Sequence, residues 1–153
     1  MRVRPATPDD VPAMMRLVNH SSTAAHWSRE HYELVFGHAA PRRAAWVIED
    51  DQKSPTNLLR GFLVAHEVAG EWEIENIVVE QNVRRQRLGT RLLVELQEVA
   101  RAERAQAIFL EVRESNQAAR AFYEGQGFEQ SGRRPRYYSQ PDEDAITYRL
   151  SLT

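Results

Sequence analysis

The feature that most limits the fold of this chain is a change in the spacing of apolar residues near Leu88. Before it, from Glu71 to Glu80, apolar and polar residues alternate as in a β-strand. After it, apolar residues recur three or four positions apart, which predicts a helix of about four turns. Its stripe consists of Leu88, Leu92, Leu93, Leu96, Val99 and Ala100. Because Ala107 to Arg113 again reads as a strand, we expect two parallel strands joined by a right-handed crossover, with a ligand at the loop before the helix.

The rest of the chain adds strands and helices on both sides of this unit. Thr7-Pro8-Asp9-Asp10 has the residues that start a helix, which is expected to fade near Asn19 to Ser22. Ser28 is placed to cap a short helix through Phe36, and Ala69-Gly70 predicts a hairpin turn. Further strands are expected at Arg2–Pro5, Ala44–Glu49, Leu58–Val68, Arg133–Tyr138 and Asp144–Leu150, with a helix at Asn116–Glu124. This order predicts a mixed α+β protein with one domain over residues 1–153.

Composition excludes several classes of protein. The 153 residues include no cysteine, so disulfides, thiolate metal sites and a cysteine nucleophile are absent. The net charge of −2 argues against a general nucleic-acid binder and against attraction to anionic membranes. We find neither an apolar run of membrane-spanning length nor a signal peptide near the start, so a cytoplasmic location is expected. The five histidines lack metal-ligand spacing, so no metal is expected.

The loop before the long helix concentrates positive charge. Arg84, Arg85, Arg87 and Arg91 lie within eight residues, at a helix start where free N–H groups and the helix dipole favour an anion. Gly89 would let the main chain approach a phosphate closely. Two interpretations stay open from these residues alone: a phosphate-binding loop, or a solvated helix start that carries arginine for solubility.

The same loop resembles the acetyl-coenzyme A signature of the GNAT acetyltransferases, Gln/Arg-x-x-Gly-x-Gly/Ala, with Arg84 at its first position and Gly89 at its last. The segments Asn76–Val79, Leu110–Arg113, Tyr123–Phe128, Tyr137-Tyr138 and Glu143–Ile146 are similar to the RimI branch, the bacterial protein N-terminal alanine acetyltransferases. The resemblance covers most of residues 72–150. It implies a twisted, mostly antiparallel sheet of about seven strands, with a parallel pair at its centre and about four flanking helices.

The resemblance also implies which residues hold acetyl-coenzyme A and the acceptor. Main-chain groups of Ile77, Val78 and Val79 are expected to bind the acetyl-pantetheine arm. The pyrophosphate is expected at Arg84, Arg85, Gln86, Arg87, Leu88, Gly89 and Thr90, and an amide contact at Asn116, which is otherwise a plain helix cap. Tyr138 is the expected acceptor contact. Arg87 departs from the pattern, because the family has a glycine there; we expect its side chain to point outward while its N–H serves the phosphate.

Acetyl transfer to an amine needs a base and an acid. An α-amino group is about 14% neutral at pH 7, but a lysine only about 0.04%, so a modest base suffices for protein N-termini. Glu111 is a carboxylate in an apolar strand and, by the resemblance, the base; alternatively it is a strand acid paired with Arg113. Tyr123 is by the resemblance the acid that protonates the leaving thiolate; alternatively it is a core residue.

Two other carboxylates are reserve candidates for the base. Strand alternation predicts Glu73, Glu75, Ile77 and Val79 on one face of the strand before the loop, and Trp72, Ile74, Asn76 and Val78 on the other. The sequence therefore favours an acetyl-coenzyme A-dependent N-acetyltransferase acting on a protein N-terminus, with that of a ribosomal protein as one candidate. A small-molecule amine or a lysine as acceptor, a non-catalytic acetyl-coenzyme A sensor and a phosphate-binding adaptor stay open as alternatives.

Overall fold

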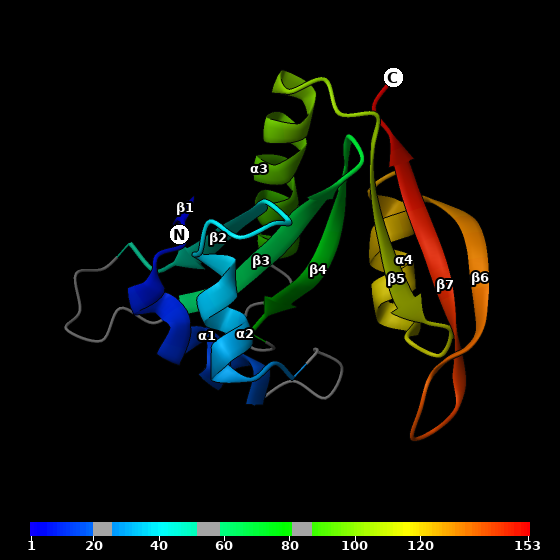
Figure 1. The fold of residues 1–153 in the computed structure, drawn as a ribbon, viewed down its shortest axis with the longest axis horizontal. Helices are drawn as coiled ribbons and strands as arrows, with labels where there is room; N and C mark the ends of the chain where they lie inside the picture. Colours follow the sequence, from blue (N-terminus) through cyan, green and yellow to red (C-terminus); the bar gives the residue numbers. More distant parts are fainter. Residues whose placement is uncertain (20–25, 52–58, 81–86) are drawn as a thin grey trace.

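A computed structural model describes residues 1–19, 26–51, 59–80 and 87–153. A seven-stranded sheet runs through it in the order β1-β2-β3-β4-β5-β7-β6 (Figure 1). Only β4 and β5 pair in parallel, and every other neighbouring pair is antiparallel. The strands are β1 (Arg2–Pro5), β2 (Arg43–Glu49), β3 (Leu59–Val68), β4 (Glu71–Val79), β5 (Ala107–Arg113), β6 (Glu129–Tyr138) and β7 (Glu143–Ser151). The helices are η1 (Pro8–Asp10), α1 (Val11–Asn19), α2 (Arg29–Val35), α3 (Leu88–Ala102) and α4 (Gln117–Gly125).

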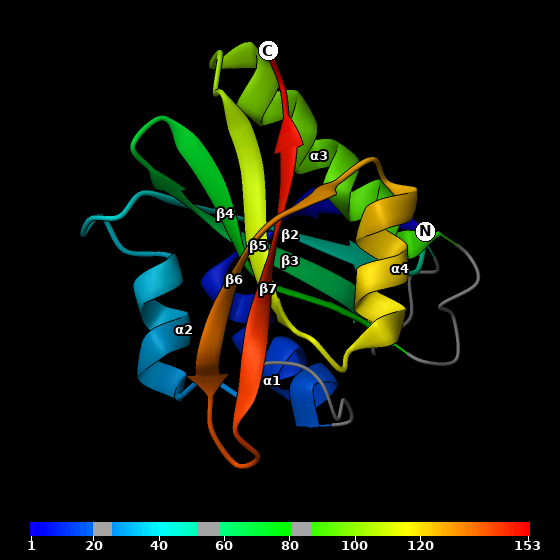
Figure 2. The ribbon, with the colours of Figure 1, turned by 90° about the vertical axis from the view of Figure 1, so that its right-hand side faces the viewer.

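Helices cover the sheet on both faces, so the molecule has three layers. The predicted leucine stripe of α3 packs with the α4 residue Tyr123 into one core. Val11 and Met14 of α1 and Tyr32 of α2 pack into a second core on the opposite face. Figure 2 shows the sheet nearly edge-on, with α2 and α4 on opposite sides of it. The predicted mixed fold is therefore confirmed, with its parallel pair at the centre of the sheet.

The predicted helix starts are confirmed by their caps. The carboxylate of Asp10 accepts a hydrogen bond from the Thr7 N–H at 2.8 Å. Ser28 Oγ accepts from the His31 N–H at 3.1 Å, and Asn116 Oδ1 from the Ala119 N–H at 3.2 Å. The expected ends at Ser22 and Leu58 lie outside the described residues. No helix in the described ranges is both long and apolar enough to cross a membrane.

The predicted faces of β4 are wrong beyond Ile74. The register with β3 shifts between Val64 and Ala65, so that Glu75 is an extra residue in β4. A bulge of this kind moves every later side chain to the other face. Ile77 and Val79 therefore join Trp72 and Ile74 on the α3 side, while Val78 packs on the α1 side.

A buried cluster of charges joins the start of the chain to β2. Arg4 forms two hydrogen bonds with Asp10, of 2.9 and 2.8 Å, and two with Glu49, both of 3.1 Å. Arg2 donates to Glu49 at 2.6 Å. Hydrogen bonds from Arg4 lower the pKa of Glu49. Burial by itself would raise the pKa of Asp10, but the hydrogen bonds from Arg4 and Thr7 outweigh it and lower that pKa.

Replacing Arg4 by Met should lower the free energy of unfolding by about 2–4 kcal/mol at pH 7, because two buried carboxylates lose their main partner. The lowered pKa values stabilise the fold fully above the ordinary values of 3.8 and 4.5, and this contribution is lost as pH falls through the native values. The deficit should therefore shrink at pH 3. Urea denaturation at both pH values checks this, with Arg2→Met, whose side chain is 65% exposed, as the milder control. Equal deficits at the two pH values would contradict the account.

Candidate active site

The central parallel strands β4 and β5 run together over a short distance and then separate. In the described part of the chain they pair at Trp72–Ile108 and Glu73–Phe109, and beyond these positions the two strands diverge (Figure 1). Both following helices, α3 and α4, begin near the end where the strands diverge. Ligands of sheets with parallel strands bind at the carboxyl ends of those strands, where the helix N-termini also lie. The diverging ends of β4 and β5 are therefore the candidate site.

The first turn of α3 presents free N–H groups at this end. The N–H groups of Leu88, Gly89 and Thr90 have no acceptor within their own helix, because no carbonyl lies four residues before them in the helix. Leu88 is 1% exposed and anchors the turn in the core. The turn is fixed in place, and N–H groups without an acceptor in their own helix favour an anion at such a helix start. Arg84, Arg85 and Gln86 of the predicted phosphate loop lie outside the described residues.

Gly89 has a role that the sequence did not reveal. A Cβ at this position would lie 3.2 Å from the ring of Phe122, which is a tight contact. Gln126 at the end of α4 also donates to the Thr90 hydroxyl at 3.0 Å. The missing side chain of Gly89 thus lets α4 pack directly on the first turn of α3.

Arg87 precedes this turn in a left-handed conformation, with φ of 59° and ψ of 32°. A side chain strains the backbone there by about 1 kcal/mol, whereas glycine adopts this conformation freely. This position therefore favours the glycine that the resembled pattern has there. The side chain of Arg87 is exposed, as expected, and forms no cap hydrogen bond with the helix.

Arg87→Gly should leave the dissociation constant of coenzyme A unchanged or lower it, because the N–H stays and the strain is removed. Arg87→Ala separates backbone from charge, since it keeps the strained conformation and removes the guanidinium. Titration calorimetry with coenzyme A measures both affinities. A tenfold or greater loss of affinity in both variants would show that the guanidinium itself holds phosphate.

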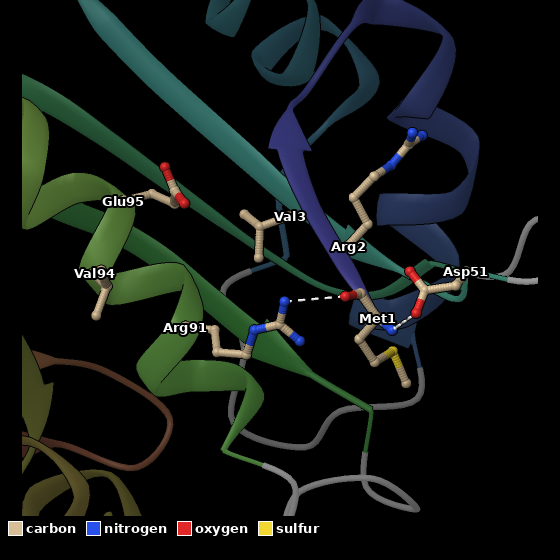
Figure 3. A pocket seen from close by; sticks show the side chains of 7 residues that line it. All are labelled: Met1, Arg2, Val3, Asp51, Arg91, Val94 and Glu95. Atoms are coloured by element: carbon tan, nitrogen blue, oxygen red, sulfur yellow. Dashed lines mark hydrogen bonds and ion pairs between the residues drawn. The ribbon is translucent and has the colours of Figure 1, made fainter.

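Arg91 is engaged elsewhere. Its guanidinium donates to the Met1 carbonyl at 3.0 Å, across a surface pocket between β1 and α3 (Figure 3). The same pocket is lined by Asp51, which contacts the amine of Met1. Of the four arginines counted in the sequence, Arg91 is therefore turned toward β1.

Glu111 lies on the face of β5 opposite to the α3 core, beside Thr147 of β7. Its side chain is 10% exposed, and its Oε1 lies 2.8 Å from Nε of Arg134 in β6. The alternative of a pair with Arg113 is wrong, because Arg113 contacts Glu143 at 3.2 Å instead. The carboxylate of Glu111 is thus mostly buried and lies on β5, just beyond the residues that pair with β4.

Tyr123 approaches from the other face. It is 4% exposed and packs edge-on against Phe122 and Phe128, with ring centroids 5.1 and 5.4 Å away. Burial raises its pKa, so the phenol keeps its proton at neutral pH. Tyr123 is therefore a core residue, which was the alternative interpretation. Its protonated hydroxyl belongs to the face of the sheet opposite to Glu111.

Comparison with known proteins identifies the fold and the family. Residues 11–128 match the model of the acetyltransferase (GNAT) family. The chain belongs to the GNAT acetyltransferases. The [ribosomal protein bS18]-alanine N-acetyltransferase of Salmonella typhimurium is 30% identical over 94% of this chain and 93% of its own length. The crystal structure of the Escherichia coli ribosomal-protein-S18-alanine N-acetyltransferase has a TM-score of 0.84 at 28% identity, over 99% of this chain and 94% of that one. Arabidopsis thaliana NAA60 in complex with acetyl-CoA has the same fold, with a TM-score of 0.87 at 15% identity over 99% and 98% of the two chains.

In this acetyltransferase the reserve candidates for the base, Glu73 and Glu75, form a cluster with residues for which the sequence predicted no role in the site. His66 of β3 lies with Nε2 3.1 Å from Glu73 and Nδ1 3.0 Å from Glu75. Arg43 of β2 contacts Glu75 at 3.1 Å. Burial raises the pKa of Glu73, and the nearby Glu111 and Glu75 add to this, although His66 opposes it. Glu75 is thus paired with Arg43, while the charges of Glu73 and Glu111 influence each other.

The other predicted residues surround the same end of the acetyltransferase sheet. Tyr138 is half-buried under the guanidinium of Arg113, 4.5 Å from ring centroid to Cζ. Burial, and then the charge of Glu111, raise the pKa of Tyr138. Ile77–Val79 lie in the part of β4 beyond its two pairs with β5. Asn116 caps α4, so the plain interpretation of this residue is confirmed.

Proposed function

We propose that this acetyltransferase uses acetyl-coenzyme A to acetylate the α-amino group of a protein N-terminus. The observation that carries the proposal is that Glu111 and Tyr123 lie on opposite faces of the sheet, with Glu111 just beyond the last pair of β5 with β4. An acetyl thioester lying between the diverging strands would expose its carbonyl carbon to an amine on the Glu111 side. Its sulfur would face the phenol of Tyr123.

The residues present suit acetyl-coenzyme A. Beyond Glu73 the β5-facing edge of β4 is free of strand pairing within the described residues, so main-chain groups of Ile77–Val79 can bind an extended pantetheine arm. The N–H groups of Leu88, Gly89 and Thr90 lie at the start of α3, where a pyrophosphate would bind. Arg84, Arg85, Gln86 and Arg87 are further proposed partners of the same pyrophosphate. Oδ1 of Asn116 is used by the cap, which leaves its NH2 group for an amide carbonyl.

The reaction then needs two proton transfers. Glu111 takes a proton from the amine, directly or through a water molecule, and the amine nitrogen attacks the thioester carbonyl. Tyr123 gives its proton to the leaving thiolate. Burial disfavours the phenolate and the thiolate alike, so the transfer between them stays feasible although the pKa of Tyr123 is raised.

An N-terminal α-amine is the acceptor that suits this site best. It is about 14% neutral at pH 7, so one carboxylate is enough to prepare it. Tyr138, whose ring lies under the guanidinium of Arg113, is the proposed acceptor contact. The names of the bacterial relatives support an N-terminal alanine of a ribosomal protein as one acceptor. With such an acceptor, the proposed place of action is the cytoplasm. Neither nucleic acid, membrane nor a metal forms part of the proposal.

Release of free thiol from acetyl-coenzyme A tests the proposal with hexapeptides that begin with Ala, Ser or Met. Matched peptides with an acetylated N-terminus and one internal lysine serve as controls. We expect release only with free N-termini. Release with the lysine peptides instead would assign a lysine acceptor, and coenzyme binding without release for any amine would indicate a sensor.

A further inference from the structure

The guanidinium of Arg134 lies on the carboxylate that the proposed reaction needs free. Nε of Arg134 is 2.8 Å from Oε1 of Glu111. The two residues belong to β6 and β5, which are separated by β7, so the arginine reaches across a whole strand. The β7 residue opposite Arg134 is Ala145, whose small side chain leaves room for this crossing.

Arg134 forms the outer side of the pair. Its side chain is 61% exposed, whereas that of Glu111 is 10% exposed. Because the guanidinium side of the pair is exposed, Arg134 can leave Glu111 and return to water at a small cost in free energy.

Tyr137 provides a second contact for the guanidinium of Arg134. Cζ of Arg134 lies 5.3 Å from the centroid of the Tyr137 ring, within the range of a cation–π contact. Tyr137 is itself 53% exposed and packs edge-on against Tyr138. The guanidinium can therefore leave Glu111 and stay over this ring.

An α-ammonium group makes the same kind of contact as a guanidinium, because both are cations that donate N–H groups to a carboxylate oxygen. Two cations on one carboxylate repel each other. An acceptor amine that arrives at Glu111 in its charged form must therefore take the place of Arg134.

We propose that Arg134 is a stand-in for the acceptor: its guanidinium occupies the ammonium position on Glu111 and is displaced when a peptide N-terminus binds. The inference rests on the proposed function, since it takes Glu111 as the base. Arg134 is then a specificity-determining residue. It competes with the charged end of the acceptor, and a ligand without an ammonium group has nothing to displace.

Steady-state kinetics with an Ala-starting hexapeptide test this in wild type, Arg134→Met and Arg134→Lys. Arg134→Met keeps an unbranched stem and removes the competing cation. It should lower KM for the peptide about two- to fivefold, with kcat and KM for acetyl-coenzyme A unchanged. Arg134→Lys retains a cation and should lie between the other two. Arg136→Met, on the same exposed strand, is the matched control and should behave as wild type.

The N-acetylated form of the same peptide supplies the decisive comparison, as an inhibitor. It lacks an ammonium group, so its inhibition constant should not change in Arg134→Met. If both peptides bind more tightly by the same factor, Arg134 is only a steric cover; if kcat falls while the peptide KM is unchanged, it assists the chemistry. Either result overturns the proposal. Failure of the proposed function gives a different result. Wild type and all variants then release no thiol with any peptide, although circular dichroism shows that they are folded. Both proposals are then wrong.

Discussion

Glu111→Gln should reduce kcat about 10²–10⁴-fold with an N-terminal peptide at pH 7, the range that a general base typically contributes. Glutamine has nearly the same shape and keeps an acceptor oxygen, but it cannot take a proton. The deficit should narrow as pH rises from 7 to 9, because the peptide amine then loses its proton to the solvent. Thiol release measured across this pH range, with coenzyme A affinity measured separately, checks both points.

Glu73→Gln is the matched control for this prediction. Glu73 is a second carboxylate of the site. Burial raises its pKa, and it lies across from Phe109 in the neighbouring strand. We expect it to lose less activity than Glu111→Gln by at least tenfold. If Glu73→Gln shows the larger loss, the base is Glu73, and Glu111 serves only as the partner of Arg134.

Tyr123→Phe should reduce kcat about 10²-fold while the fold is retained. The substitution removes the proton donor and keeps the ring that packs against Phe122 and Phe128. The loss should lie at the low end of the usual range for a general acid, because a thiolate with a conjugate pKa of about 8.5 leaves more easily than an amine. Single-turnover measurements with saturating acetyl-coenzyme A isolate the transfer step.

Tyr148→Phe removes another buried hydroxyl and serves as the control for Tyr123. The Tyr148 hydroxyl donates to Glu124 at 2.9 Å and accepts from Arg120 at 3.0 Å. We expect Tyr148→Phe to lower the melting temperature and to leave kcat unchanged. Unimpaired turnover in Tyr123→Phe would remove the acid role and leave Tyr123 as a core residue alone.

The fold was predictable where local chemistry decides it. Helical spacing and capping residues gave α3 and the starts of the other helices, because these depend on neighbours within four residues. The bulge at Glu75 was not predictable, because it depends on how β4 aligns with β3 rather than on either strand by itself. The faces assigned to Ile77, Val78 and Val79 failed for this reason.

The candidate site was predictable where it depends on residues that are neighbours in the sequence. The N–H groups at the start of α3 follow from a helix that begins after a strand. The positive φ of Arg87 does not follow from it, because the residue that caps a helix usually has an extended backbone. Contacts across the sheet were missed, among them Arg134 on Glu111 and His66 between two carboxylates. His66 could have been found, since counting back from a two-residue turn at Ala69-Gly70 places it opposite Glu73. Arg134 could not, because its partner lies two strands away.

A crystal structure with a peptide–coenzyme A bisubstrate conjugate tests the central claim most directly. The account predicts the sulfur between the diverging ends of β4 and β5, within hydrogen-bond reach of the Tyr123 hydroxyl. It also predicts the peptide nitrogen within direct or one-water reach of the Glu111 carboxylate, and Arg134 moved off it. A conjugate bound elsewhere, or bound there with either side chain remote from its reacting atom, would contradict it.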